Sequence, residues 1–312
     1  MRAVGVMRYG GPEALEIVEL PEEHAGPGQV RLRVHAAAVS PTDTFVRNGA
    51  RAEQQQVDPP PYVPGMDAAG VVDEVGEGVA TGIAVGDHAM AIVLPKGAHG
   101  AYRESIVLPA ESVARAPAGS SHAEASTLPM NGLTAVMSLD LLGLSAGQTL
   151  AVTGAAGAFG GYMVQLGKAA GLVVVADASD ADRELVASLG ADVVLPRGDG
   201  FAARVRERFP DGVDAVADGA VLNERVLPAL RDGGAFNAVR GWKGPPERGI
   251  TFTATIVAKY RREHAKLDQL GRQAEKGVVT LRVDRTYPAE QAAEAHRRLE
   301  AGGARGRQVI LF

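Results

Sequence analysis

A glycine-rich turn between an apolar strand and a helix is the feature that most constrains this chain. Residues 149–153 read as a short buried strand, residues 154–160 supply three glycines and small side chains, and a helix is expected over residues 162–170. This order is typical of dinucleotide-binding folds, because the glycines let a pyrophosphate approach the backbone and the helix start offers N–H groups. The sequence therefore predicts dinucleotide binding at Gly154, Ala155, Ala156, Gly157, Ala158, Phe159 and Gly160.

Two questions stay open: whether the glycine turn binds a dinucleotide at all, and which dinucleotide it would bind. The turn lacks the first Gly-x-Gly pair of the strict fingerprint, so the glycines could also serve only to make a tight turn. Asp177 closes the following strand, where a carboxylate can accept from the ribose 2'-OH and would repel a 2'-phosphate, which favours NADH. Ser179 and Arg183 lie nearby and could hold a phosphate instead, and Asp177 could equally be a solvated loop acid.

Composition and charge narrow the class of protein. The 312 residues exceed the usual size of one hydrophobic core, so two domains are expected. Lys plus Arg number 32 against 37 Asp plus Glu, a net charge of -5, which gives no reason to expect a nucleic acid partner. The absence of cysteine excludes disulfides and cysteine-ligated zinc. Without a signal peptide or an apolar run of roughly 18 residues, we expect a cytoplasmic protein that acts on a small molecule and has no membrane partner.

The pattern of predicted strands and helices changes near Pro117. Before it, short strands alternate with Gly/Pro turns, as in an irregular antiparallel β domain. After it, apolar strands alternate with amphipathic helices, the pattern of βαβ units on a parallel sheet. A long polar helix is expected at 260–276, and the tail from 278 should rejoin the first domain. The expected strands are 3–7, 29–38, 69–75, 88–94 and 105–108, then 149–153, 173–176, 192–195, 215–218, 235–239 and 250–257, with 308–312 at the end.

Further motifs extend over nearly the whole chain: Ala38 to Asp43, Pro64 to Val72, Val75 to Val79 with Val85 to Asp87, Gly100 to Tyr102, Asn131 to Ala135, Leu189 to Asp192 and Arg231 to Gly234. Together with the glycine turn they resemble the medium-chain dehydrogenase/reductase superfamily, in particular its zinc-free quinone oxidoreductase (zeta-crystallin-like) branch. In the zinc enzymes of that superfamily a cysteine precedes the aspartate of the first motif and Gly-His-Glu stands in the second. Here Ser40 and Met66-Asp67 take those places, so these positions cannot assemble a metal site.

The resemblance implies an α/β fold with two domains. A GroES-like, β-rich catalytic domain would comprise residues 1–118 and 259–312, and a Rossmann domain with a doubly wound parallel sheet would comprise residues 119–258. The active site would lie in the cleft between them. The branch usually takes NADPH, an expectation that conflicts with Asp177, so NADPH and NADH both stay open.

The resemblance also assigns roles to single residues. It places Ser40 where related enzymes carry an asparagine near the nicotinamide, has Asp43 shape that loop, and puts Thr134, with Asn131 one turn before it, beside the ring. One hydroxyl cannot offer the two donors of an amide, so Ser40 leaves the source of substrate polarisation open. Tyr62 could line the substrate cleft or be a packed loop tyrosine. The remaining expected cofactor contacts are Ala238, Val239 and Arg240, after which Trp242 is either a substrate lid or a capping aromatic.

These features predict an NAD(P)H-dependent, zinc-independent reductase that transfers hydride to a quinone or an α,β-unsaturated carbonyl compound. Two alternatives remain at this point: an enoyl-thioester reductase of a biosynthetic pathway, and a non-catalytic NAD(P)H-binding protein. Residues 250–257 would form the last strand of the sheet, and because an exposed edge invites pairing we expect a homodimer through it.

Overall fold

The computed structural model describes residues 1–55 and 58–312 and divides the chain into two units. The first comprises Met1–Met130, Arg261–Lys276 and Leu281–Phe312, and the second comprises Asn131–Tyr260 and Gly277–Thr280. Residues 119–130, which the sequence pattern had assigned to the second domain, belong to the first unit because helix α3 (His122–Ala125) packs against its sheet. Conversely, residues 259–260 and 277–280 belong to the second unit.

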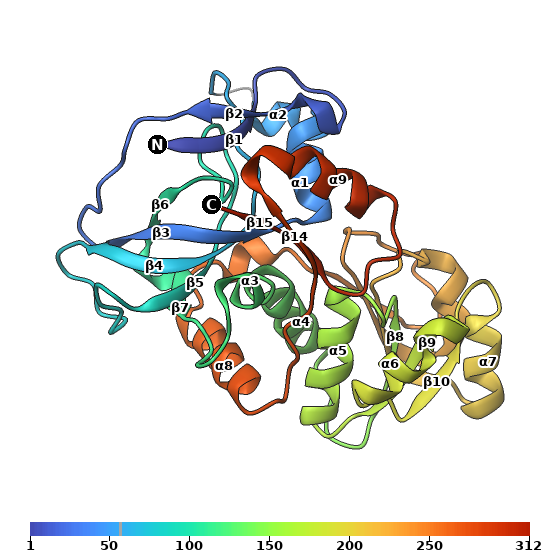
Figure 1. The fold of residues 1–312 in the computed structure, drawn as a ribbon. Coiled ribbons are helices and arrows are strands. Elements are labelled where there is room, and N and C mark those ends of the chain that lie inside the picture. Colours follow the sequence, from blue (N-terminus) through green and yellow to red (C-terminus); the bar gives the residue numbers. More distant parts are fainter. Residues whose placement is uncertain (56–57) are drawn as a thin grey trace. The chain divides into compact units, whose positions relative to one another are not determined.

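The first unit is built on a seven-stranded sheet in the order β14-β15-β3-β4-β5-β7, with β6 paired to β3 (Figure 1). Its strands are β3 (Gln29–Ala38), β4 (Asp67–Val75), β5 (His88–Ile92), β6 (Ser105–Pro109), β7 (Val113–Arg115), β14 (Val283–Pro288) and β15 (Arg307–Leu311). A separate antiparallel pair joins β1 (Arg2–Val6) and β2 (Leu15–Glu19). The C-terminal strand β15 pairs with β3, which confirms that the tail rejoins the first domain.

Four more helices belong to the first unit: α1 (Pro41–Asn48), α2 (Ala52–Gln55), α8 (His264–Glu275) and α9 (Ala292–Glu300), with 3₁₀ turns at Pro12–Ala14, Ala110–Ser112 and Ala289–Gln291. Helix α1 was not anticipated, although Ser40 is its N-cap and Pro41 its first residue, a common way to start a helix. The long polar helix expected at 260–276 is shorter, because the chain forms the 3₁₀ turn Val257–Tyr260 before α8 begins.

The second unit has the six-stranded parallel sheet predicted from the alternating pattern. The strand order is β10-β9-β8-β11-β12-β13, formed by β8 (Thr149–Thr153), β9 (Val173–Ala178), β10 (Val193–Pro196), β11 (Val213–Asp218), β12 (Leu230–Ala238) and β13 (Thr251–Ala254). The chain runs outward from β8 to β10 and then returns to β11 on the other side of β8. Strand order therefore reverses between β8 and β11, the place where open parallel sheets bind ligands beyond the carboxyl ends of their strands.

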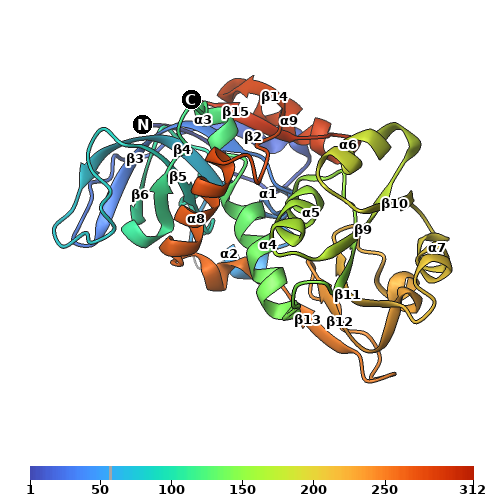
Figure 2. The same cartoon turned by 90° about the horizontal axis from the view of Figure 1, so that it is seen from below.

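The helices of this unit are α4 (Pro129–Leu142), α5 (Ala158–Ala169), α6 (Arg183–Ser188) and α7 (Phe201–Arg208), with 3₁₀ turns at Asp180–Asp182 and Asn223–Ala229. Helix α5 packs on β8 and β9 (Figure 1), and α6 and α7 pack near β10, as Figure 2 shows. The last strand is half as long as expected from residues 250–257. It ends at Ala254, and Thr255 just beyond it donates its hydroxyl to Asn237 Oδ1 at 3.0 Å.

Within the described residues, no helix combines the length and the apolar character needed to cross a membrane.

Candidate functional site

The glycine turn connects β8 to α5 at the point where strand order reverses. Gly154 has a φ of +69°, in the left-handed region that favours glycine. A Cβ on Gly160 would lie 2.2 Å from Gly154 O, and one on Gly219, after β11, would lie 2.7 Å from Thr153 O. The helix start, the turn and the loop after β11 are therefore packed backbone against backbone at this corner.

Asp177 forms a hydrogen bond with the backbone of the glycine turn. It lies inside β9, is 5% exposed, and its Oδ1 accepts from the Ala155 N–H at 3.0 Å. Burial raises the pKa of the Asp177 carboxyl, whereas the backbone N–H groups of Ala155 and Gly154 act in the opposite direction, as does the charge of Arg197. The carboxylate is therefore a buried support of the turn and not a solvated loop acid.

The two residues that the sequence proposed for a 2'-phosphate are already engaged. Ser179 Oγ donates to Asp182 Oδ2 at 2.5 Å, and Arg183 Nη1 donates to Val194 O at 3.3 Å. The structure adds Arg197, which the sequence analysis missed. Its N–H donates to Ala178 O at 2.9 Å, and its exposed side chain follows β10, whose Leu195 is paired in register with Asp177. The signal in the sequence was a basic residue immediately after the third strand.

Hydrogen bonds connect α4 to the end of β12. Ser138 Oγ lies 2.9 Å from Thr134 O and 2.8 Å from Thr255 Oγ1, and Thr255 Oγ1 donates to Asn237 Oδ1 at 3.0 Å. The single hydroxyl proton of Ser138 can be donated either to Thr134 O or to Thr255 Oγ1. The helix that carries Thr134 and Asn131 is therefore tied to the strand end at Ala238. Among these expected contacts, Thr134 is 8% and Ala238 3% exposed, Val239 and Asn131 are half-buried and Arg240 is exposed.

The first unit brings Ser40 and Asp43 together at the start of α1. Asp43 accepts three hydrogen bonds, from the Ser40 N–H at 2.7 Å, the Gly65 N–H at 3.0 Å and the Tyr102 hydroxyl at 3.1 Å. Both Ser40 and Asp43 are fully buried. Burial is the largest influence on Asp43 and raises its pKa to about 7, against the pull of the two backbone N–H groups. Asp43 thus holds the motif 38–43 against the motif 64–72.

A buried histidine continues this network. Tyr102 Oη lies 3.1 Å from His296 Nε2, and Arg47 Nη1 lies 3.2 Å from His296 Nδ1. Arginine only donates, so Nδ1 must be the acceptor and Nε2 carries the proton that is donated to Tyr102. Burial, with Arg47 as a second cause, lowers the pKa of His296 to about 3. The imidazole is therefore neutral in the folded chain. The sequence analysis missed both His296 and Tyr102 as members of the site, since they lie far from Asp43 along the chain.

His296→Gln is expected to make the fold less sensitive to acid. A histidine with a lowered folded pKa stabilises the fold above its ordinary pKa of 6.5 and loses that contribution as pH falls toward the folded value near 3. The stability advantage of the wild type over His296→Gln should shrink by about 2 kcal/mol between pH 7.5 and pH 5, measured by urea unfolding. A difference that stays constant with pH would contradict the neutral buried imidazole.

The donor set of the first unit does not fit a zinc ion. Ser40 Oγ accepts from the guanidinium of Arg307 at 2.7 Å, so a permanent cation already occupies that oxygen. Met66 stands at the histidine position and is 5% exposed. His35 and His88 stack on His122, with ring centroids 4.7 and 4.8 Å apart. In this arrangement the rings lie face to face, and their nitrogen atoms do not converge on a common point. Among the described residues no group of three His, Asp or Glu side chains is placed to hold a metal ion.

The two aromatic candidates occupy different settings. Tyr62 is half-buried, stacks on Tyr9 with ring centroids 5.1 Å apart, and donates to Asp58 O at 3.3 Å. Trp242 is half-buried against Phe236 and Phe252, at centroid distances of 5.3 and 5.7 Å. This packing supports the capping interpretation of Trp242 over a lid.

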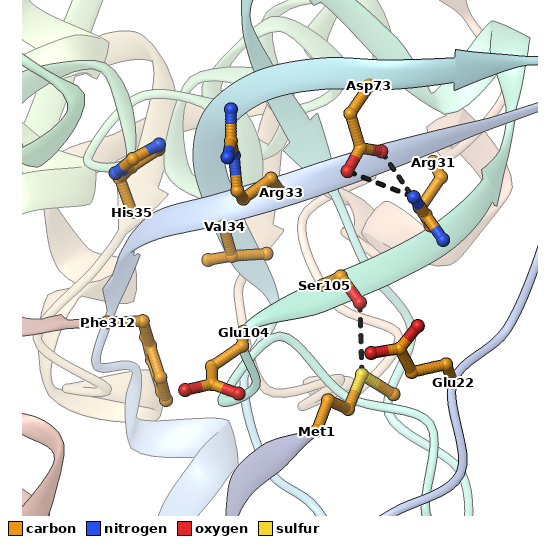
Figure 3. Close-up of a pocket in the computed structure, with 10 residues that line it drawn as sticks. All are labelled: Met1, Glu22, Arg31, Arg33, Val34, His35, Asp73, Glu104, Ser105 and Phe312. Atoms are coloured by element: carbon orange, nitrogen blue, oxygen red, sulfur yellow. Dashed lines mark hydrogen bonds and ion pairs between the residues drawn. The ribbon is translucent and has the colours of Figure 1, made fainter.

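A hollow of about 350 Å³ in the first unit is lined by other residues: Met1, Glu22, Arg31, Arg33, Val34, His35, Asp73, Glu104, Ser105 and Phe312 (Figure 3). Within it, Arg31 Nε and Asp73 Oδ1 on neighbouring strands form an ion pair at 2.9 Å. It shares no residue with the residues that the motifs single out, so this hollow is not the candidate site. The motif chemistry is the stronger guide because it combines a backbone cradle with buried, perturbed acids.

Comparison with known proteins gives matches over the whole chain. Residues 26–118 match the family model described as alcohol dehydrogenase GroES-like domain, and residues 189–310 match that of zinc-binding dehydrogenase. The chain is 29% identical to quinone oxidoreductase of Mus musculus, covering 100% of this chain and 98% of that protein. It is 31% identical to the chloroplastic NADPH-dependent alkenal/one oxidoreductase of Arabidopsis thaliana, covering 99% of this chain and 79% of that protein.

Solved structures agree with these matches. An NAD-dependent alcohol dehydrogenase superposes with a TM-score of 0.88 at 31% identity, covering 100% of both chains. A mycobacterial protein solved with NADPH gives a TM-score of 0.85 at 27% identity, again over 100% of both chains. Both nicotinamide dinucleotides therefore occur among proteins similar to this one.

Proposed function

We propose that this chain reduces quinones or α,β-unsaturated carbonyl compounds with NADPH. The chain belongs to the medium-chain dehydrogenase/reductase superfamily, and within it to the zinc-free quinone oxidoreductase branch. The observation that carries this proposal is the glycine turn, which lies where the strand order of the parallel sheet reverses and which Asp177 holds through the Ala155 N–H. In this proposal Ser40 of the first unit would donate to the carbonyl oxygen, and Asp43 would hold Ser40 in place by accepting its backbone N–H.

The residues present fit a nicotinamide dinucleotide. When bound, the dinucleotide supplies the hydride. The glycine turn from Gly154 to Gly160 would hold the pyrophosphate, because its glycines let the phosphate approach the backbone and α5 presents its positive end there. Helix α4, with Thr134, and the end of β12 at Ala238 would hold the nicotinamide side, and hydrogen bonds connect these two elements.

The preference for NADPH rests on Arg197. Asp177 would repel a 2'-phosphate if its carboxylate faced the ribose freely, but it is 5% exposed and engaged by Ala155. Arg197 is exposed at the carboxyl end of the neighbouring strand, and its charge acts on Asp177. A guanidinium at that position can bind the 2'-phosphate through two N–H donors, and its positive charge offsets the negative charge of Asp177.

Arg197→Ala is expected to raise the KM for NADPH about tenfold or more, the usual cost of a lost charge-assisted hydrogen bond, and to leave the KM for NADH within about twofold. Steady-state assays with both dinucleotides measure this. Arg225→Ala serves as the matched control, since Arg225 is an exposed arginine of the same unit that pairs with Asp199 at 3.0 Å. Equal changes for the two dinucleotides would reject Arg197 as the phosphate ligand and reopen NADH as the cofactor.

Substrate class is tested by following the absorbance of NADPH and NADH against quinones, enones and an enoyl thioester. The proposal expects turnover of quinones or enones at a higher kcat/KM than the thioester. Preference for the thioester would favour a biosynthetic enoyl reductase. Tight dinucleotide binding without turnover of any acceptor would instead favour a non-catalytic binding protein.

We also propose a homodimer through β13. This strand is the last in the sheet order, and Ile256 just beyond it is 53% exposed. Pairing of two edges would satisfy the outer N–H and C=O groups of β13 and cover that side chain. Size-exclusion chromatography with light scattering should give twice the chain mass of 32.3 kDa, and a monomer at assay concentration would overturn the dimer. A cytoplasmic location and a small-molecule substrate without nucleic acid or membrane partners stay part of the proposal.

A further inference from the structure

Arg307, the first residue of β15, has its guanidinium surrounded by four acceptors of the first unit. Nη2 donates to Ser40 Oγ at 2.7 Å and to Asp67 Oδ2 at 2.9 Å. Nε donates to Val39 O at 3.2 Å, and Nη1 donates to Thr127 O at 3.4 Å. Arg307 is 5% exposed, and Ser40 and Asp67 are fully buried. Acceptors from three separate stretches of chain therefore engage four of the five N–H donors and fix the orientation of the guanidinium.

This geometry decides where the hydroxyl proton of Ser40 can point. A guanidinium has no lone pair to offer, so Ser40 Oγ must be the acceptor in its contact with Arg307. The backbone N–H of Ser40 is already taken by Asp43. Over residues 1–55 and 58–312, no hydrogen bond uses the hydroxyl proton itself. Ser40 therefore keeps one unused donor, directed away from Arg307, at the start of α1.

We propose that Arg307 is a positioning residue, which turns the hydroxyl proton of Ser40 toward the carbonyl oxygen of the substrate and strengthens it as a donor. The inference rests on the proposed function and deepens it by naming what stabilises the oxygen. A hydroxyl whose oxygen accepts a charge-assisted hydrogen bond is polarised, because linked hydrogen bonds reinforce one another. Arg307 thus compensates for the asparagine that related enzymes carry at the position of Ser40. Ser40 is fully buried, so bulk water does not compete for that proton.

In the reduction of an enone, the C–H bond at C4 of NADPH would break as a new C–H bond forms at the β-carbon, and NADP⁺ would be left. The electron pair of the C=C bond becomes a π bond between the α-carbon and the carbonyl carbon, and the C=O π pair moves onto the oxygen, which carries the negative charge of the enolate. Ser40 donates a hydrogen bond to that oxygen without giving up its proton, and water later protonates the α-carbon. Because Arg307 and Ser40 are in place before the charge develops, the stabilisation requires little reorganisation.

A double-mutant cycle with Ser40→Ala and Arg307→Lys tests the coupling. Arg307→Lys keeps a cation beside Asp67 and so preserves the fold, but it loses the fixed fork that holds Ser40. Ser40→Ala should lower kcat for an enone on the order of 100-fold, as for the loss of one oxyanion donor, with the KM for NADPH within about threefold. Arg307→Lys should lower kcat about tenfold. The double variant should be no slower than Ser40→Ala, because Arg307 acts through Ser40.

Arg103→Lys is the matched control, since Arg103 is a buried arginine of the same unit, 1% exposed, that pairs with Glu23 at 3.2 Å. It should keep the wild-type kcat. Losses that multiply in the double variant, or an Arg307→Lys kcat within about twofold of wild type, would overturn the inference.

A binding measurement separates this inference from the proposed function. 4-Nitrophenolate presents a fixed negative oxygen in place of the one that develops during reduction. In the presence of NADP⁺, calorimetry should show it bound at least about tenfold more tightly by the wild type and Arg103→Lys than by Ser40→Ala and Arg307→Lys. Absence of turnover with every acceptor would reject the proposed function, whereas equal phenolate affinity in all four proteins would reject the role of Arg307.

Discussion

Gly160→Ala is expected to weaken NADPH binding by about 100-fold or more while most of the fold survives. The added Cβ would lie 2.2 Å from Gly154 O and 2.7 Å from Ala155 Cα, and both are backbone atoms that cannot rotate away. Helix α5 must therefore move off the turn, which separates its N–H groups from the pyrophosphate and costs about 1–3 kcal/mol of stability. Fluorescence titration with NADPH measures the affinity, and thermal unfolding by circular dichroism measures the fold.

Gly167→Ala in the same helix is the matched control. Its Cβ would meet only side chains, Val174 Cγ2 at 3.2 Å and Leu150 Cδ2 at 3.3 Å, which can shift by a few tenths of an ångström. Its NADPH affinity should stay within about threefold of wild type, because the phosphate corner is untouched. If Gly160→Ala bound NADPH as well as Gly167→Ala does, the turn would not be the pyrophosphate site.

Asp67→Ala is expected to cost about 3–5 kcal/mol of folding stability. Asp67 is fully buried, its Oδ1 accepts from the Met130 N–H at 2.6 Å, and its Oδ2 accepts from Arg307. Removing the carboxylate leaves a buried guanidinium without its counter-charge. Burial raises the pKa of the Asp67 carboxyl, and the positive charge of Arg307 acts against that rise.

Urea unfolding of Asp67→Ala and of Asp73→Ala makes the comparison. Asp73 forms an ion pair with Arg31 at 2.9 Å, but its side chain is 27% exposed, so its loss should cost at most about 1 kcal/mol. Equal losses in the two variants would show that Asp67 is not the counter-charge on which the buried arginine depends.

The sequence was most informative where structure depends on neighbours along the chain. The six parallel strands, the glycine turn and Asp177 follow from local patterns, because an apolar strand, a tight turn and a helix each have their own periodicity. The exception within this unit is β13, which stops at Ala254, while the Thr255 hydroxyl bonds to Asn237, a contact that no local pattern encodes.

Contacts between distant segments explain what the sequence analysis missed. Arg307 lies 267 residues from Ser40 along the chain, and His296 lies 194 residues from Tyr102. Their roles depend on β15 pairing with β3 and on α9 packing beside α1, which only the folded chain brings about. Arg197 was missed for a related reason, since its place beside Asp177 comes from the register between β10 and β9.

Hydride transfer without a metal is the central claim, and a label can follow it directly. Protein treated with a chelator should reduce an enone with NADPH deuterated at the nicotinamide C4, and mass spectrometry should find the deuterium on the β-carbon of the saturated product. The rate should not change when zinc is added back. A product without deuterium, or an activity that is lost with the chelator and restored by zinc, would contradict the account.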